Sequence, residues 1–233
     1  MVAMVRLPPV DRLRAVAEAA TRVFGRQGYR GTRTADVAAA AGMSSGSLFT
    51  YVESKEALFY LVFAHGFGLF ADGIPPLPLA TPEPGATVEL IAQKLRRAPA
   101  PRLRAALGEA RPGDVRAELV AIVEERYDLI TDLWPLLAVI ERCAVDLPQL
   151  DALYFGRVRR ANFDQLARYL EMRSGEGLIR QVDEPEITAR IIVETVSWFS
   201  WKRHGDRDAA MYDEEATRRT VTEFVCTSLL GST

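Results

Sequence analysis

Short hydroxyl side chains gather between residues 32 and 55, where the sequence reads TRTADVAAAAGMSSGSLFTYVESK. A helix over residues 45–52 would place Leu48 and Val52 on its inward face, because they are four residues apart. Its opposite face would carry Ser45, Ser47, Thr50 and Tyr51. Such side chains can enter the major groove of DNA without steric bulk, and a helix N-terminus directs unpaired N–H groups toward phosphate. The pattern predicts a helix that lies on DNA, although an ordinary αα-hairpin has the same outline.

The residues before and after this helix can position it. The inward side chains of a short helix over 34–41 would be Val37, Ala38 and Ala41. Their small size allows the next helix to cross closely, and Gly42 suits the sharp turn between the two helices. Ser44 or Ser45 can cap the helix that follows, and Ser54 can cap a fourth helix that runs toward residue 70. The spacing therefore predicts a helix-turn-helix.

The N-terminal segment differs in charge from the rest of the chain. Residues 1–56 carry eight basic and five acidic groups, a net charge of +3, so the total of -2 leaves -5 for the remainder. A basic segment on an acidic body indicates that one end meets a polyanion. A first helix is expected there, with Gly28 after its last turn. Its apolar stripe is Leu13, Val16, Ala17, Ala20, Val23 and Phe24.

Across residues 10–60 the sequence resembles the TetR family of bacterial regulators. The matching positions, in order and at the family's spacing, are Phe24, Gly28, Tyr29, Thr32, Val37, Ala38, Ala41, Gly42, Ser44, Gly46, Leu48, Phe49, Tyr51, Ser54, Lys55 and Glu56. The resemblance implies an all-α homodimer with a three-helix DNA-binding domain, residues 1–56, and a larger helical ligand-binding and dimerisation domain, residues 57–233. It also implies a repressor that a small molecule releases from a near-palindromic double-stranded operator.

The same resemblance implies which residues contact DNA. They are Thr32, Arg33, Thr34, Ser44, Ser45, Gly46, Ser47, Thr50, Tyr51 and Lys55. Thr32 and Arg33 lie where the family's second helix meets the phosphate backbone, and Tyr51 and Lys55 lie where it contacts phosphates. The sequence departs from the family pattern at Thr34, usually aliphatic, at Phe49, often Tyr, and at Val52, usually Phe. The departures leave open which hydroxyls touch DNA.

Helical periodicity continues through the rest of the chain. Helices are expected over 87–97, 102–109, 114–133, 135–145, 150–173, 186–204 and 214–230. A proline-rich segment, residues 74–85, interrupts the pattern with five prolines and cannot be regular helix. We interpret it as a connection inside the second domain, and the true domain boundary as lying within the fourth helix.

The second domain offers candidates for ligand binding and for dimerisation. The candidate ligand residues are Arg126, Tyr127, Trp134, Tyr154, Glu194 and Trp198. Aromatic stripes are more often plain core, and a charge on an apolar face needs a partner. For Glu194 that partner could be a cationic ligand, Arg126 or the second subunit, and we favour a structural ion pair. Two apolar stripes would form the dimer surface or pack within one subunit: Ile187, Ile191, Thr195, Trp198 and Phe199, and Val221, Phe224, Val225 and Leu229.

Several function classes find no support in the sequence. The chain lacks HExxH, P-loop and paired-carboxylate patterns, so we expect neither an enzyme nor a cofactor. His65 and His204 have no metal-ligand neighbours, and Cys143 and Cys226 are expected to be buried. With no signal peptide and no long apolar run, we expect a cytoplasmic protein without a membrane partner. An activator, a nucleoid-type regulator without a ligand and a protein-interaction module remain alternatives.

Overall fold

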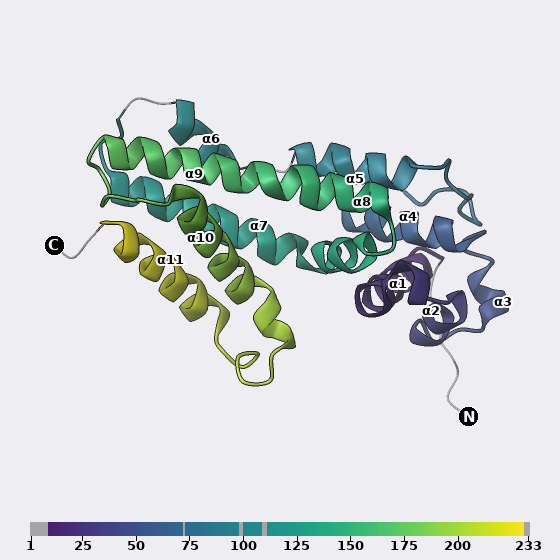
Figure 1. Cartoon of the computed structure of the whole chain (residues 1–233). Helices are drawn as coiled ribbons and strands as arrows, with labels where there is room; N and C mark the ends of the chain where they lie inside the picture. The colour runs from purple at the N-terminus through teal and green to yellow at the C-terminus, as the bar shows by residue number, and fades with distance from the viewer. Residues whose placement is uncertain (1–8, 72, 98–99, 109–110, 231–233) are drawn as a thin grey trace. The chain divides into compact units, whose positions relative to one another are not determined.

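The computed structural model describes residues 9–71, 73–97, 100–108 and 111–230. Regular structure in these ranges is helical apart from one isolated bridge between Val52 and Leu79, which confirms the predicted all-α class (Figure 1). The helices are α1 (Pro9–Gly31), α2 (Thr34–Ala40), α3 (Ser45–Leu48), α4 (Lys55–Gly66), α5 (Ala86–Arg97), α6 (Pro101–Gly108), α7 (Val115–Ala144), α8 (Pro148–Leu153), α9 (Arg160–Gly175), α10 (Pro185–Ser200) and α11 (Glu214–Leu230). A π-helical segment, Tyr154–Arg159, joins α8 to α9, and a 3-10 turn, Lys202–Gly205, follows α10.

Several predicted helix boundaries were wrong. α3 ends at Leu48 rather than at residue 52, because the chain leaves the helix through a series of turns. α7 runs through Pro135 without a break, although a proline removes one helical hydrogen bond. The predicted helix over 150–173 is divided by the π-helical segment, which shifts the hydrogen-bond register.

The helices divide into two compact units. The first unit contains α1 to α5, α7 from Pro135 onward and α8, and the second contains α6, α7 up to Trp134, α9, α10 and α11. This division reports packing, whereas the boundary expected after residue 56 concerns DNA binding and stays a prediction.

The core of the first unit forms around α1, which packs against α2 and α4. All members of the predicted apolar stripe are buried: Leu13, Val16, Ala17, Ala20, Val23 and Phe24. The Phe24 ring meets the edge of Phe59 on α4, with 5.1 Å between ring centroids, and Tyr29 meets the same ring at 5.1 Å. Aromatic pairs in this arrangement add to the free energy of burial. α1 is thereby joined to the helix that follows the helix-turn-helix.

α1 is kinked at Gly28 rather than ended there. Gly28 has φ 77° and ψ 178°, a conformation that is essentially restricted to glycine. A Cβ at this position would lie 3.1 Å from Oδ2 of Asp146 and 3.4 Å from the carbonyl oxygen of Arg142. The same Asp146 oxygen accepts the Arg30 backbone N–H at 2.7 Å. The kink therefore brings the end of α1 against the residues at the end of α7.

In the second unit, α10 packs against α9 and α11, and α6 packs against α9. Arg173 on α9 is fully buried, which would be costly without partners. Its guanidinium donates to both oxygens of Glu118, each at 2.9 Å, and to Glu176 at 2.8 Å. Tyr169 donates to Glu118 at 2.9 Å. These bonds connect α9 to the start of α7.

We predict that Gly28→Ala destabilises the protein by about 1–3 kcal/mol, because alanine cannot adopt the backbone conformation of Gly28 without strain. Thermal and urea unfolding of the purified protein would measure the change. Gly31→Ala is the matched control, since its added Cβ would lie 3.5 Å from Gln27 at ordinary contact distance. Equal stabilities of the two variants would contradict the strain assigned to Gly28.

Candidate nucleic-acid interface

The turn between α2 and α3 forms as expected from the residues around Gly42. Gly42 has φ 66°, and the N–H of Met43 donates to the carbonyl oxygen of Ala38 at 2.9 Å. This bond satisfies an acceptor at the end of α2 that would otherwise lack a partner. Val37, Ala38, Leu48 and Val52 are buried. The two short helices are thus held by small apolar contacts and one tight turn.

α3 presents the hydroxyl-rich face that the sequence predicts. Ser44 is its N-cap: the Ser44 side chain accepts the Ser47 N–H at 3.1 Å, and the two hydroxyl oxygens lie 2.9 Å apart. After the helix ends, Thr50 Oγ1 donates to the carbonyl oxygen of Ser47 at 2.7 Å. The exposed residues are Ser44, Ser45, Gly46, Ser47, Phe49 and Thr50. The predicted rotation of α3, with Leu48 inward and the serines outward, is confirmed.

The residues at the junction of α1 and α2 differ from one another in exposure. Thr32 is buried, and its hydroxyl donates to the carbonyl oxygen of Gly28 at 2.7 Å. The direct DNA contact expected of its side chain does not fit this placement, because the hydroxyl already bonds the kinked end of α1. Arg33 is exposed, and Thr34 is half-buried. Arg33 is therefore the accessible cation at the start of α2.

Lys55 and Tyr51 are both half-buried at the end of the predicted contact region. The Lys55 ammonium lies 4.7 Å from the centroid of the Tyr29 ring, an attractive cation–π geometry. Tyr29 donates to Oε1 of Glu56 at 3.0 Å, and burial together with this carboxylate raises the pKa of Tyr29. A hydrogen bond from its own backbone N–H lowers the pKa of Glu56. Lys55 is thus held beside the aromatic cluster of α1 and α4.

In the second unit, a small apolar cavity of about 20 Å³ has Arg126 among its lining residues. Leu103, Leu119, Ile122 and Leu166 also line it. Arg126 donates to Oδ1 of Asn162 at 3.3 Å. The cavity has room for about one water molecule, so a larger ligand would require the surrounding helices to separate.

The four candidate aromatic residues do not converge on this cavity. The Tyr127 hydroxyl donates to Glu214 at 2.7 Å, and Trp134 stacks on His204 with 6.1 Å between ring centroids. Tyr154 belongs to the first unit, where its hydroxyl donates to Glu141 at 3.3 Å. Trp198 contacts Phe199 edge to face. These contacts explain the aromatic residues as packing and hydrogen-bonding groups, and a ligand-binding role for them stays a prediction.

Glu194 has arginine partners within its own subunit. It is paired with Arg159 and, at 2.8 Å, with Arg190 one helical turn earlier. The structural ion pair favoured from the sequence is present, with Arg159 and Arg190 as partners. The sequence signal for Arg190 was its i,i+4 spacing from Glu194, whereas Arg159 lies 35 residues away.

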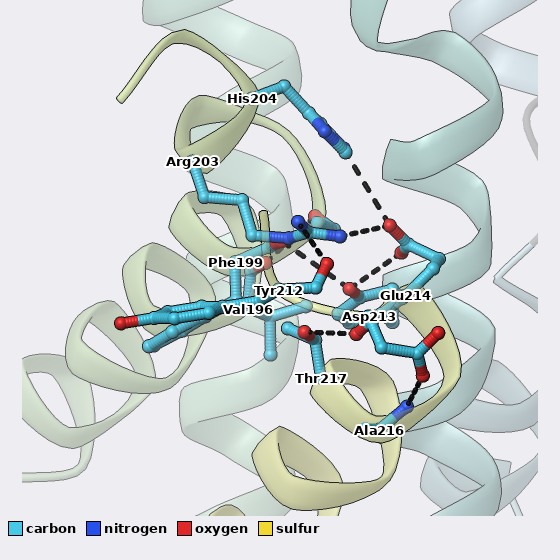
Figure 2. Close-up of polar contacts among 11 residues, drawn as sticks. Val196, Phe199, Arg203, His204, Tyr212, Asp213, Glu214, Ala216 and Thr217 are labelled. Carbon is cyan, nitrogen blue, oxygen red and sulfur yellow. Dashed lines mark hydrogen bonds and ion pairs between the residues drawn. The ribbon is translucent and has the colours of Figure 1, made fainter. Parts of the chain in front are cut away.

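A groove of about 540 Å³ lies between α10 and α11, lined in part by Phe199, Tyr212 and Phe224. Figure 2 shows the polar contacts that close the turn at its end: Arg203 and His204 both point toward Oε2 of Glu214. Arg203 is 1% exposed and also donates to the carbonyl oxygens of Phe199 and Tyr212. Helical periodicity did not indicate this buried arginine, because its partners Tyr212 and Glu214 lie beyond the turn that follows α10.

Neither a metal site nor a membrane span is present in the part of the chain that the structure describes. No cluster of three or more His, Cys, Asp or Glu side chains could hold a metal ion within these residues. No helix among them has the length and apolar character needed to cross a bilayer. His65 is half-buried on α4, and burial lowers its pKa.

Both cysteines are buried, as expected. Cys143 Sγ lies 3.9 Å from the carbonyl oxygen of Phe24, a weak hydrogen bond between α7 and α1. Burial, with a smaller effect of Asp146, raises the pKa of the Cys143 thiol to about 12, and burial also raises the pKa of Cys226. Because the thiolate is the reactive form, both groups are poor nucleophiles near neutral pH.

Comparisons with known proteins agree with the geometry of the first unit. Residues 16–61 match the family described as bacterial regulatory proteins, tetR family. This range runs from the middle of α1 through the helix-turn-helix into α4. No curated protein matches the sequence of this chain.

Solved structures of similar fold cover nearly the whole chain. A bacterial regulatory protein in the tetR family from Rhodococcus RHA1 is 16% identical, with a TM-score of 0.55 over 95% of this chain and 98% of that one. The fatty acid degradation regulator FadR from Bacillus halodurans is 18% identical, with a TM-score of 0.50 over 95% and 96%. AibR, solved with isovaleryl coenzyme A and operator DNA, is 19% identical, with a TM-score of 0.50 over 94% and 98%. At these identities the likeness is one of fold.

We predict that thiol reagents do not modify the native protein at neutral pH, because both thiols are buried and protonated. A maleimide followed by mass spectrometry should leave the folded chain unlabelled over minutes and label both cysteines after denaturation in guanidinium. Labelling of Cys143→Ala and Cys226→Ala would assign any reaction that occurs. Modification of either thiol in the native state at the rate of the denatured chain would contradict the prediction.

Proposed function

We propose that the chain is a transcriptional repressor that a small molecule releases from its operator, because residues 16–61 match the tetR family of bacterial regulatory proteins and the chain has the all-helical fold of solved structures from that family. The observation that carries the proposal is the exposed face of α3. Serine and threonine hydroxyls lie outward there over the buried Leu48, inside the range that matches the family. A surface of this chemistry suits the major groove of double-stranded DNA.

The proposed contacts with DNA are of two kinds, those with base edges and those with phosphates. Ser45, Gly46, Ser47 and Thr50 are exposed on or next to α3 and would read base edges. Ser44 would hold the N-terminus of α3 at the groove, while Thr34, Tyr51 and Lys55 would lie at its border. Arg33 would bind a phosphate, since a guanidinium contributes through counterion release and carries no base specificity. Thr32 supports this arrangement from the interior.

The ligand-binding part of the proposal concerns the second unit. The cavity is lined by apolar side chains together with Glu125 and Arg126, and the Arg126 guanidinium would meet the anionic group of a ligand with an apolar body. AibR, a protein of similar fold, was solved with isovaleryl coenzyme A, which has both features. Opening of a cavity of about 20 Å³ by such a ligand would be the event that alters DNA binding. On this proposal the protein acts in the cytoplasm and is not an enzyme.

The test of the proposed function is DNA binding by the whole protein. DNase footprinting on the region upstream of its own coding sequence should protect a near-palindrome whose half-sites lie about 34–36 Å apart. Arg33→Gln should weaken binding to every sequence and reduce the slope of log K against log salt by about two per dimer, because about one counterion is released for each phosphate contact.

The control for this experiment is Arg104→Gln, which removes an exposed positive charge from the second unit. It should leave the salt slope unchanged. Absence of specific protection in the upstream region and in a random-sequence selection would overturn the proposed function.

The dimer would form through α10 and α11. Three large apolar side chains stand exposed on these helices: Ile187 at 58%, Ile191 at 59% and Phe224 at 64%. The rest of the predicted second stripe, Val221, Val225 and Leu229, is buried within the subunit. Apolar side chains this exposed on neighbouring helices indicate a surface that another protein covers. A second copy fits because two helices from each subunit can form a four-helix interface.

We predict that Ile191→Arg converts the dimer to a monomer, because a charge at the centre of an apolar interface would lose its hydration without gaining a partner. Sedimentation velocity over a range of protein concentrations would measure the shift. Val145→Arg is the matched control, since Val145 is also an exposed aliphatic residue, at 81%, but belongs to the first unit. A wild-type protein that sediments as a monomer at micromolar concentration would rule out this interface.

A further inference from the structure

The proline-rich segment makes backbone contact with the end of the helix-turn-helix. The Leu79 N–H donates to the carbonyl oxygen of Tyr51 at 2.8 Å, and the Leu79 carbonyl oxygen accepts the Glu53 N–H at 3.0 Å. These two bonds form the parallel bridge between Leu79 and Val52. The Leu79 side chain is 9% exposed. A segment that the sequence indicated only as a connection therefore pairs with the chain directly after α3.

Side-chain bonds extend this contact by two residues. The Thr81 N–H donates to Oε2 of Glu53 at 2.9 Å, and the Thr81 hydroxyl donates to Ser54 Oγ at 2.8 Å. Ser54 Oγ also accepts the Ala57 N–H at 3.0 Å, which makes Ser54 the N-cap of α4. One hydroxyl thus joins the proline-rich segment to the first turn of α4.

All four bonds end on residues 51–54, the link between α3 and α4. This link determines the direction in which the chain leaves α3, so a change in its path would rotate the hydroxyl face. α3 has four residues, too few to hold a fixed orientation through its own hydrogen bonds. Prolines on both sides of Leu79 restrict φ and reduce the freedom that the segment loses on pairing.

We propose that Leu79–Thr81 is a latch that positions α3, so that Thr81 and Leu79 help to determine operator specificity from outside the helix-turn-helix. The inference rests on the proposed DNA-binding function. Neither residue is in the range that matches the family. They act as positioning residues: they bond the link after α3 and leave the DNA contacts themselves to the face of that helix.

The test compares Thr81→Val with Thr81→Ser in the full-length protein. Valine keeps the shape and the backbone N–H of Thr81 but removes its hydroxyl, whereas serine retains the hydroxyl. Fluorescence anisotropy would measure affinity for the footprinted operator and for a scrambled duplex of the same length and composition. With two latches per dimer, Thr81→Val should reduce operator affinity about thirtyfold while binding to scrambled DNA stays within about twofold, because two hydrogen bonds of about 1 kcal/mol each are lost and about 1.4 kcal/mol corresponds to tenfold. Thr81→Ser should restore the wild-type ratio.

A second variant tests whether the effect of Thr81→Val arises from a loss of folding. Glu53→Ala removes the acceptor of the Thr81 N–H at an exposed position, so the fold should survive. It should reduce the same specificity ratio, and hydrogen exchange should show faster exchange of the Leu79 and Glu53 amides in both variants. Faster exchange with an unchanged specificity ratio would overturn the latch. Equal losses of affinity for operator and scrambled DNA would also overturn it. A wild-type protein that binds no DNA would instead overturn the proposed function, and the latch with it.

Discussion

A helix of four residues buries too little surface to fix its own orientation, and the first unit is arranged around this constraint. Nucleation of a helical turn is unfavourable, and α3 adds almost no propagation to offset it. Its orientation therefore depends on Leu48 and Val52, which are completely buried, and on the positive φ of Gly42 at the preceding turn. The aromatic contacts of Phe24, Tyr29 and Phe59 support these anchors from α1 and α4. The exposed hydroxyls have a fixed position only because the apolar residues beneath them are fixed by burial.

The second unit is held together by a different means, since its helices are joined by buried charges as well as by apolar packing. Arg173 and Arg203 are almost completely inaccessible to solvent, and each is surrounded by carboxylate and carbonyl oxygens. Removal of one partner from such a group costs more than the pair contributes, because the remaining charge stays buried. Such networks restrict which helices can separate from one another. A ligand that enters beside Arg126 would therefore have to separate the apolar contacts around it.

Local sequence patterns predicted which segments form helices, whereas contacts between distant residues determine where these helices end. The stripe from Leu13 to Phe24 predicted both α1 and its buried face, and Ser44 and Ser54 were recognisable as helix caps. Periodicity could not show that α7 continues through Pro135, because a proline removes one helical hydrogen bond and usually ends or kinks a helix. Nor could it show that Thr32 points inward, since the acceptor of its hydroxyl depends on the kink at Gly28.

In the candidate site, too, local spacing could be interpreted from the sequence and distant contacts could not. The outward serines of α3 could be predicted from their spacing against Leu48. The Arg159 partner of Glu194 and the pairing of Leu79 with Tyr51 could not, because they join segments that are remote in the sequence.

The hydrogen bond between Thr81 and Ser54 also affects how the first unit folds and which fragment of it would keep all its contacts. The two residues are 27 positions apart, so their bond closes a loop whose entropic cost rises with the logarithm of its length. During synthesis, the ribosome completes the helix-turn-helix before Leu79–Thr81, the segment that braces it, has emerged. A fragment cut after Leu61 would include every residue of the family match and still lack that brace. The family match thus ends before the segment that bonds residues 51–54, and a fragment that retains these bonds has to include residue 81.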